Sequence, residues 1–174
     1  MRRIAVRERR IRQYARVPDD SQIVTHSDPA LPARSNYIIR VALGVHGMPD
    51  RFEQLWARKD DSGYELCSIP YFTYGLSLGD RVAWSEGTDT VEILTKSDHK
   101  TVRFAFQDRQ LAADRHVELH GQLAESGCRM EFLSDGYGAV DIADKGQERA
   151  ALRVLSRWLK EGTLSWEWAD PAQD

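Results

Sequence analysis

Hydrophobic and polar residues alternate through much of the first half of the chain, and a period of two residues predicts β-strands. Within residues 52–58, for example, Glu53, Leu55 and Ala57 share one face. Polar turn residues such as those at 60–63 separate the strands. The alternation predicts strands over residues 37–43, 52–58, 64–69, 81–84 and 91–95. Short strands with polar turns indicate a small, strongly bent sheet or barrel.

From residue 100 onwards, strand patterns and helix patterns take turns. Gly127 follows the first helix pattern, where glycine suits a left-handed C-terminal position. Asp144 begins the second helix pattern, with Gln147 as its capping-box partner. The predicted order is strand 101–106, helix 108–125, strands 129–133 and 138–142, a helix from 144, and strand 164–168. This is the order of a ferredoxin-like split β-α-β unit.

The sequence therefore predicts an α+β protein in which a small bent β-sheet or barrel is followed by a ferredoxin-like β-α-β-β-α-β unit. We expect residues 1–35 to form a basic N-terminal arm, because its prolines interrupt regular structure. Residues 36–98 are expected to form a small β-rich subdomain. Residues 99–170 are expected to form the ferredoxin-like subdomain.

A distinctive run of aromatic residues and glycines lies upstream of the ferredoxin-like pattern. It reads Ile-Pro-Tyr-Phe at residues 69–72, Tyr-Gly-Leu at 74–76 and Leu-Gly-Asp-x-Val at 78–82. With a Glu-x-Leu-Trp element at 53–56 and an Ala-Val-Asp-Ile strand at 139–142, this run resembles an uncharacterised bacterial domain family of unknown function. The resemblance spans about residues 37–168. It implies an architecture, but it implies no activity, because none is established for the family.

That family often shows a Gly-His-x-Thr-x-Arg segment before the first ferredoxin-like strand. Here Asp98 replaces the glycine, whereas His99, Thr101 and Arg103 are kept. Because these three side chains alternate along one strand, they point to the same side. They could grip a phosphate or carboxylate, or they could form a polar seam between the two halves.

Composition and charge narrow the function classes. Hydrophobic residues make up 41% of the 174 residues, enough for a sizeable core. No apolar run reaches the roughly 18–20 residues that cross a bilayer, and the N-terminus lacks the apolar segment of a signal peptide. Two distant cysteines, Cys67 and Cys128, suit a reducing compartment. We therefore expect a cytoplasmic protein with no membrane partner.

The charge is distributed unevenly. Residues 1–16 contain seven arginines and one glutamate, whereas the remainder contains 17 basic and 26 acidic residues. The basic arm could bind nucleic acid, fold back on the acidic body or grip an acidic partner, and it could also be a solvated terminus. The acidic body argues against nucleic-acid binding over the whole surface.

Other candidate sites have plain structural alternatives. Tyr71, Phe72 and Tyr74 could form an aromatic binding surface, or they could plug the end of a barrel. Asp80 follows Gly79 and is expected to shape a turn. His116 and His120 share a helix face but lack the sequence of a metalloprotease and a third ligand, so neither a metal site nor a cofactor is expected.

Three function classes remain. The favoured one is a non-catalytic protein-binding module, an immunity protein (antitoxin) that neutralises a bacterial toxin by direct binding, with acidic residues steering a basic toxin domain. Its candidate carboxylates are Asp60, Asp61, Glu86, Asp89 and Glu92. The second class is a nucleic-acid-associated regulator that uses the arginine-rich arm and aromatics such as Phe104 and Phe106 on the sheet. The third is an enzyme whose site forms no sequence motif, around His99 and Arg103.

Overall fold

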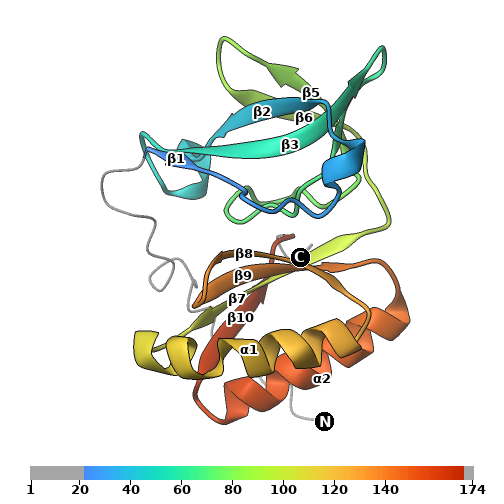
Figure 1. Cartoon of the computed structure of the whole chain (residues 1–174). Coiled ribbons are helices and arrows are strands. Elements are labelled where there is room, and N and C mark those ends of the chain that lie inside the picture. The colour runs from blue at the N-terminus through green and yellow to red at the C-terminus, as the bar shows by residue number, and fades with distance from the viewer. Residues whose placement is uncertain (1–21, 171–174) are drawn as a thin grey trace, which may run out of the picture.

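The computed structural model describes residues 22–170, so the arginine-rich segment at residues 1–16 lies outside the described part. Two β-sheets lie one above the other, and two helices cover the far face of the second sheet (Figure 1). The loop that follows the fourth strand runs between the two sheets (Figure 1). The α+β class predicted from the sequence is confirmed.

The first sheet is built around its longest strand, β3 (Phe52–Asp60). That strand pairs in antiparallel fashion with β2 and β4 and in parallel with β1. A hydrogen bond from the backbone N–H of Ala42 to the carbonyl of Asp89 links β2 to the β5–β6 turn, so the sheet bends back on itself. The other strands are β1 (Ile23–Val24), β2 (Tyr37–Ala42), β4 (Gly63–Leu66), β5 (Arg81–Ser85) and β6 (Thr90–Thr95).

The second sheet has the strand order β10-β7-β9-β8, with every neighbouring pair antiparallel. Helix α1 (Arg109–Glu125) connects β7 to β8, and helix α2 (Lys145–Lys160) connects β9 to β10. Both helices lie on the same face of the sheet (Figure 1). The strands are β7 (Lys100–Phe106), β8 (Arg129–Ser134), β9 (Tyr137–Ile142) and β10 (Leu164–Trp168).

Both helices begin where a capping aspartate precedes them. The Asp144 carboxylate accepts hydrogen bonds from the N–H groups of Gly146 and Gln147, and the side chain of Gln147 accepts one from the N–H of Ala143. The capping box expected from the sequence is therefore present in part, because Asp144 caps Gln147 but the Gln147 side chain binds the N–H of Ala143 and not that of Asp144. Gly127 has φ 75°, as expected of a residue that ends a helix in the left-handed region.

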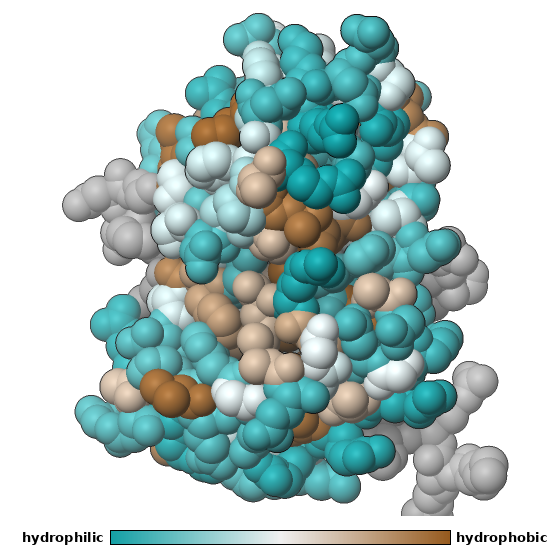
Figure 2. Space-filling model, turned by 45° about the vertical axis from the view of Figure 1, so that its right-hand side comes forward, coloured by the Kyte–Doolittle hydropathy of each residue, from teal (hydrophilic) through white to brown (hydrophobic). Residues whose placement is uncertain are grey.

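Three clusters of buried side chains form the core. One lies between the second sheet and the helices and includes Phe104 and Trp158, and another fills the bent first sheet and includes Leu55. The third lies between the two sheets and contains Tyr71 from the loop and Tyr137 from β9. The two halves therefore share a core, and hydrophobic residues reach the surface at mid-height between them (Figure 2).

Residues 22–35 differ from the sequence-based division, which assigned them to the basic arm. Val24 on β1 is buried and pairs with β3, and the backbone N–H of Leu31 donates to the carbonyl of Cys67. The short 3-10 helix η2 (Pro32–Arg34) follows. The described part of that segment therefore belongs to the β-rich unit, and a two-residue strand is too short for alternation to reveal it.

Candidate functional site

The loop at residues 67–80 is held by a buried carboxylate, that of Glu53. Strand β3 places Glu53 on the same inward face as Leu55 and Ala57, where its side chain has no exposed surface. Its oxygens accept hydrogen bonds from the backbone N–H groups of Tyr71, Phe72 and Thr73, at 2.5, 3.1 and 2.8 Å. They also accept the Thr73 hydroxyl at 2.7 Å. Glu53 therefore acts as the anchor of the loop.

A second buried carboxylate, Glu131 on β8, holds the same loop from the other sheet. It accepts hydrogen bonds from the N–H groups of Ala30 and Ile69, both at 2.7 Å. His26 lies between the two carboxylates: its Nε2 is 3.0 Å from Glu53, and its Nδ1 is hydrogen-bonded to Glu131. The His26 ring also stacks on Tyr71, with centroids 4.1 Å apart. This His26–Glu53–Glu131 cluster joins both sheets to the loop.

The cluster favours the charged forms of His26 and Glu53. Burial alone would lower the pKa of His26, but the hydrogen bonds to Glu131 and Glu53 outweigh it and raise the pKa to about 9. Burial would raise the pKa of Glu53, but the hydrogen bond and charge of His26, the Thr73 hydroxyl and the charge of Arg103 lower it to about 2. The cluster is therefore an ion pair network, fully hydrogen-bonded and removed from solvent.

Arg103 on β7 also lies in the interior. Its guanidinium donates to the carbonyls of Pro70 and Thr73, at 3.3 and 2.6 Å, and it stacks over the Tyr74 ring at 4.3 Å. Thr101, two residues before it, is buried on the same side. These contacts match the polar-seam alternative for the alternating residues of this strand, because the guanidinium binds the protein's own loop.

Asp80 ties the end of the loop to the irregular segment at residues 96–99, which links the two sheets. Its buried carboxylate accepts hydrogen bonds from the N–H groups of Ser77 and Ser97 and from the Lys96 ammonium, each at 2.7–2.8 Å. Gly79 before it has φ 80°, a conformation that favours glycine. This arrangement agrees with the geometric role expected for the Gly-Asp pair.

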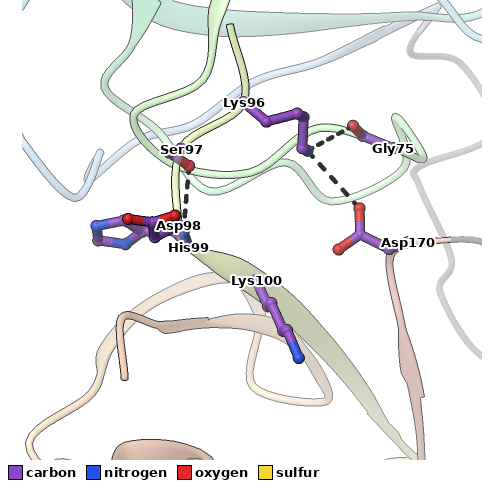
Figure 3. A pocket seen from close by; sticks show the side chains of 7 residues that line it. All are labelled: Gly75, Lys96, Ser97, Asp98, His99, Lys100 and Asp170. Atoms are coloured by element: carbon purple, nitrogen blue, oxygen red, sulfur yellow. Dashed lines mark hydrogen bonds and ion pairs between the residues drawn. The ribbon is translucent and has the colours of Figure 1, made fainter. Parts of the chain in front are cut away.

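A solvent-accessible groove lies beside this connection, with a volume of about 580 Å³. Lys96, His99 and Lys100 bring positive or titratable groups to it, but their side chains point in different directions (Figure 3). Lys96 points to the carbonyl of Gly75 and to Asp170, at 2.9 and 3.8 Å. Arg103 does not line this groove. The structure therefore does not bring His99 and Arg103 together as one anion-binding site.

His99 does form a pair that can move a proton. Its Nδ1 lies 2.7 Å from the carboxylate of Asp141, which is buried, and burial raises the pKa of that carboxyl while the hydrogen bond to His99 opposes the rise. A histidine oriented by a carboxylate is the arrangement of a general base. The ring is turned away from Lys96 and Asp170 (Figure 3), so the charged groups of the groove do not converge on it.

The aromatic residues of the loop lie mostly in the core. Tyr71 and Phe72 are each 1% exposed, and both pack near Tyr137, whose hydroxyl donates to the carbonyl of Tyr71. Tyr74 is half-buried, and its hydroxyl is hydrogen-bonded to Glu167. The plug alternative therefore describes Tyr71 and Phe72, because their rings fill the space between the sheets instead of forming a surface.

The sheet aromatics considered for RNA binding are also covered. Phe104 and Phe106 point towards the helices and are buried with Trp158. Tyr137 and Ala105 point to the other face, where the loop covers them. Neither face of this sheet displays these rings for stacking on bases, which is what RNA-binding sheets of this kind require.

The acidic residues proposed for partner binding fall into two groups. Asp61 and Glu86 are exposed in turns, and Asp60 is exposed but paired with Arg81 at 2.7 Å. Asp89 is different, because it is 6% exposed and its carboxylate pairs with Arg40 at 2.7 Å. Its role is to bind Arg40 across the sheet, so it is removed from the exposed acidic set.

The histidines of α1 have ordinary helix-surface contacts. The His116 Nδ1 donates to the carbonyl of Ala112, and the His120 ring stacks on Phe132. Burial lowers the pKa of His120, and the charge of His116 adds to the effect. In the part of the chain that the structure describes, no group of three or more His, Cys, Asp or Glu residues could hold a metal ion.

Sequence reasoning missed His26, Glu131 and Asp141 as members of polar networks. Glu53 carried a usable signal, because it is in phase with Leu55 and Ala57 on the face that proves to be buried. A glutamate in phase with core residues indicates a buried anchor. His26 gave no signal, because its neighbours in sequence show no periodic pattern.

The fold and these motif residues can now be compared with known proteins. The model of a domain of unknown function, DUF4265, matches residues 53–166, which is more than half of the chain. The chain belongs to the DUF4265 family. The matched range of this DUF4265 domain begins at Glu53, the anchor of the loop, and includes Arg103 and Glu131. The family description states no activity.

A solved structure shows the same fold. This DUF4265 domain is similar to a hypothetical protein from Neisseria gonorrhoeae, with 19% sequence identity and a TM-score of 0.55 over 68% of this chain and 83% of that chain. At that identity the likeness concerns the fold alone. No curated protein matches the sequence. No helix within residues 22–170 is long and apolar enough to cross a membrane.

Proposed function

We propose that this DUF4265 domain is a protein-binding module, an immunity protein that neutralises a bacterial toxin by direct binding. The observation that carries the proposal is an apolar edge with an acidic rim on the first sheet. Strand β6 is last in the pairing order of that sheet, and it exposes Ile93 and Leu94 to 42% and 49%. Exposed apolar residues with polar surroundings are typical of protein interfaces.

The acidic residues lie next to this edge. A Cβ atom placed on Gly63 would be 3.1 Å from the side chain of Leu94, and Gly63 pairs with Asp60 at the β3–β4 turn. Asp61 follows in that turn, and Glu92 is exposed on β6 itself. Carboxylates around an apolar patch would speed encounter with a basic toxin domain and favour it over acidic proteins.

The interior supports the same function. Two buried charged side chains, the sequence candidate Arg103 and Glu53, are bound to the backbone of the loop. Their hydrogen bonds stabilise the fold and leave the outer surface to make contacts. We infer that the Ile-Pro-aromatic-Phe signature is a mark of the family because it forms the segment that Glu53 holds.

Two finer statements belong to this proposal. We infer a ferredoxin-like arrangement for residues 99–170, which the order β10-β7-β9-β8 and the two crossover helices support. We also propose a cytoplasmic location, which the free and buried thiols of Cys67 and Cys128 support.

A neutralisation assay tests the function. Proteins encoded beside this gene in its own genome are expressed one at a time in a bacterial host, with and without this chain. We expect one of them to stop growth, co-expression to restore colony counts by several orders of magnitude, and the purified pair to form a stoichiometric complex.

A pair of surface variants locates the interface. Leu94→Arg places a positive charge in the apolar edge and is expected to abolish rescue. The matched control is Val117→Arg, because Val117 is 70% exposed on α1, in the other half of the molecule. Co-purified RNA or DNA in place of a protein, or rescue that Leu94→Arg leaves unchanged, would contradict the proposal.

A further inference from the structure

Three half-buried aromatic rings from three different strands form a cluster on the first sheet. Tyr37, Tyr64 and Trp84 come from β2, β4 and β5, and all three pack against the core of the bent sheet. Their ring centroids are 5.3 Å apart for the two tyrosines and 6.0 and 5.8 Å from each tyrosine to the tryptophan. The Trp84 Nε1 donates to the carbonyl of Arg40 at 2.7 Å, which fixes the indole.

A cation from the same chain already lies on this cluster. The Lys59 ammonium is 4.9 Å from the centroid of Tyr37 and 5.6 Å from that of Tyr64. Within residues 22–170 the Lys59 side chain makes no ion pair, although its backbone is held by Asn36. Aromatic faces attract cations through the ring quadrupole, and the attraction is strongest for tryptophan. Lys59 is exposed, so another cation could replace it.

We propose that Tyr37, Tyr64 and Trp84 form a binding site for a lysine or arginine side chain of the protein partner, with Lys59 as the occupant in the free protein. The inference rests on the proposed function and names the chemistry of its partner. Tyrosine and tryptophan are the residues that most often dominate binding energy at interfaces. A basic toxin would supply the cation.

The surrounding charge favours such an occupant. Asp61 lies in the turn before β4, which carries Tyr64, and Glu86 lies in the turn after β5, which carries Trp84, so an exposed carboxylate adjoins each of these two strands. Residues 22–170 contain 23 acidic and 17 basic residues. A partner's cation would therefore meet both ring faces and a negative field, and it would displace Lys59 into solvent.

The probe for this site is tetramethylammonium chloride, which cannot donate hydrogen bonds and so reports the aromatic site alone. The readout is the NMR shift of the Trp84 indole N–H, at ionic strength held constant with sodium chloride. We expect millimolar binding to the wild type and at least threefold tighter binding to Lys59→Ala, because that variant vacates the site.

Two further variants keep the outcome decisive. Each is added to the Lys59→Ala protein. Tyr64→Leu is expected to weaken tetramethylammonium binding at least fivefold, whereas Trp168→Leu, on β10, is expected to leave it unchanged. An unchanged indole signal from Trp56, whose Nε1 donates to the carbonyl of His26, verifies the fold of each variant. Equal affinities in the wild type and Lys59→Ala, or an unmoved Trp84 signal, would overturn the site.

The two proposals fail in different ways. If tetramethylammonium binds as expected but no neighbouring protein is neutralised, the proposed function is overturned and the cation site stands. If a toxin is neutralised and its affinity is unchanged by Trp84→Leu, the site has no role in partner binding and the function stands. A more than tenfold loss of toxin affinity in Trp84→Leu supports both.

Discussion

At the scale of single residues, three charged side chains occupy positions that hydrophobic residues usually fill. Glu53, His26 and Glu131 are each 3% exposed or less, and their hydrogen bonds reach the backbone of the loop and of residue 30. A buried charge is tolerated when it is paired and hydrogen-bonded, and it becomes costly once a partner is removed. The cluster is therefore a sensitive point of the fold.

Replacing the loop anchor should be strongly destabilising. The substitution Glu53→Gln removes the negative charge next to His26. It also replaces one carboxylate oxygen, which accepts backbone N–H groups, with an NH₂ group, which can only donate. We expect a loss of about 3–5 kcal/mol in the free energy of unfolding, measured by urea denaturation. The exposed Glu92→Gln on β6 is the control, with an expected change within about 0.5 kcal/mol. A loss below about 1 kcal/mol in Glu53→Gln would contradict the anchor role.

The same cluster predicts how stability depends on pH. The pKa of His26 is raised from 6.5 to about 9, so its contribution is complete below pH 6.5 and is lost as the pH rises through 9. The pKa of Glu53 is lowered from 4.5 to about 2, so its contribution is complete above pH 4.5 and is lost as the pH falls through 2. Unfolding free energies measured from pH 3 to 9.5 should therefore peak between pH 4.5 and 6.5. A flat profile from pH 6.5 to 9.5 would be inconsistent with a charged His26.

At the scale of elements, a glycine in β9, Gly138, leaves space for side chains of the two neighbouring strands, β7 and β8. A Cβ atom at Gly138 would lie 2.8 Å from the ring of Phe104 and 2.9 Å from both the Glu131 carbonyl and the Phe132 ring. Two aromatic rings and a carbonyl oxygen therefore leave no room for a side chain at Gly138. Overpacking of this kind forces rings or backbone to move.

Alanine substitutions at two glycines should have opposite effects. We expect Gly138→Ala to lower the melting temperature and cost about 1–3 kcal/mol. Gly121 lies within α1 with no atom within 4 Å of a Cβ position, so Gly121→Ala should raise stability by up to about 1 kcal/mol. Thermal unfolding followed by circular dichroism measures both. Equal effects of the two substitutions would show that space around Gly138 is not limiting.

Most elements could be predicted because their residues follow simple periods. The expected strand at 37–43 is observed as Tyr37–Ala42, the helix expected at 108–125 as Arg109–Glu125, and the last strand at 164–168 without change. The strand expected at 64–69, just before Pro70, is observed as β4, which ends earlier, at Leu66. Alternation and capping are local properties, so a sequence displays them directly.

The candidate site could not be predicted in the same way, because its contacts join distant segments. His26 and Glu131 are 105 residues apart, and Arg103 meets Thr73 across 30 residues. Nothing in a single sequence says that a histidine in an irregular segment will lie between two glutamates. The aromatic run was visible, but whether Tyr71 faces solvent or the core depends on the second sheet.

At the scale of the whole molecule, the loop at residues 67–80 is the layer that makes two sheets into one structure. Its N–H groups bind Glu53 from the first sheet and Glu131 from the second, and its rings share a core with β7 and β9. In the function proposed above, strand β6 and the half-buried aromatic cluster meet a partner, and the polar interior stabilises the scaffold that presents them.

Hydrogen exchange at the loop amides tests this account most directly. The N–H groups of Tyr71, Phe72 and Thr73 are bound by a buried carboxylate in the shared core, so NMR in D₂O should show them exchanging only through global unfolding. The free energy of opening at these amides should equal the free energy of unfolding from urea denaturation within about 1 kcal/mol. Amides of β3 and β9 should give the same value. Exchange of these three amides at the rate of a surface loop, while β3 and β9 stay protected, would contradict it.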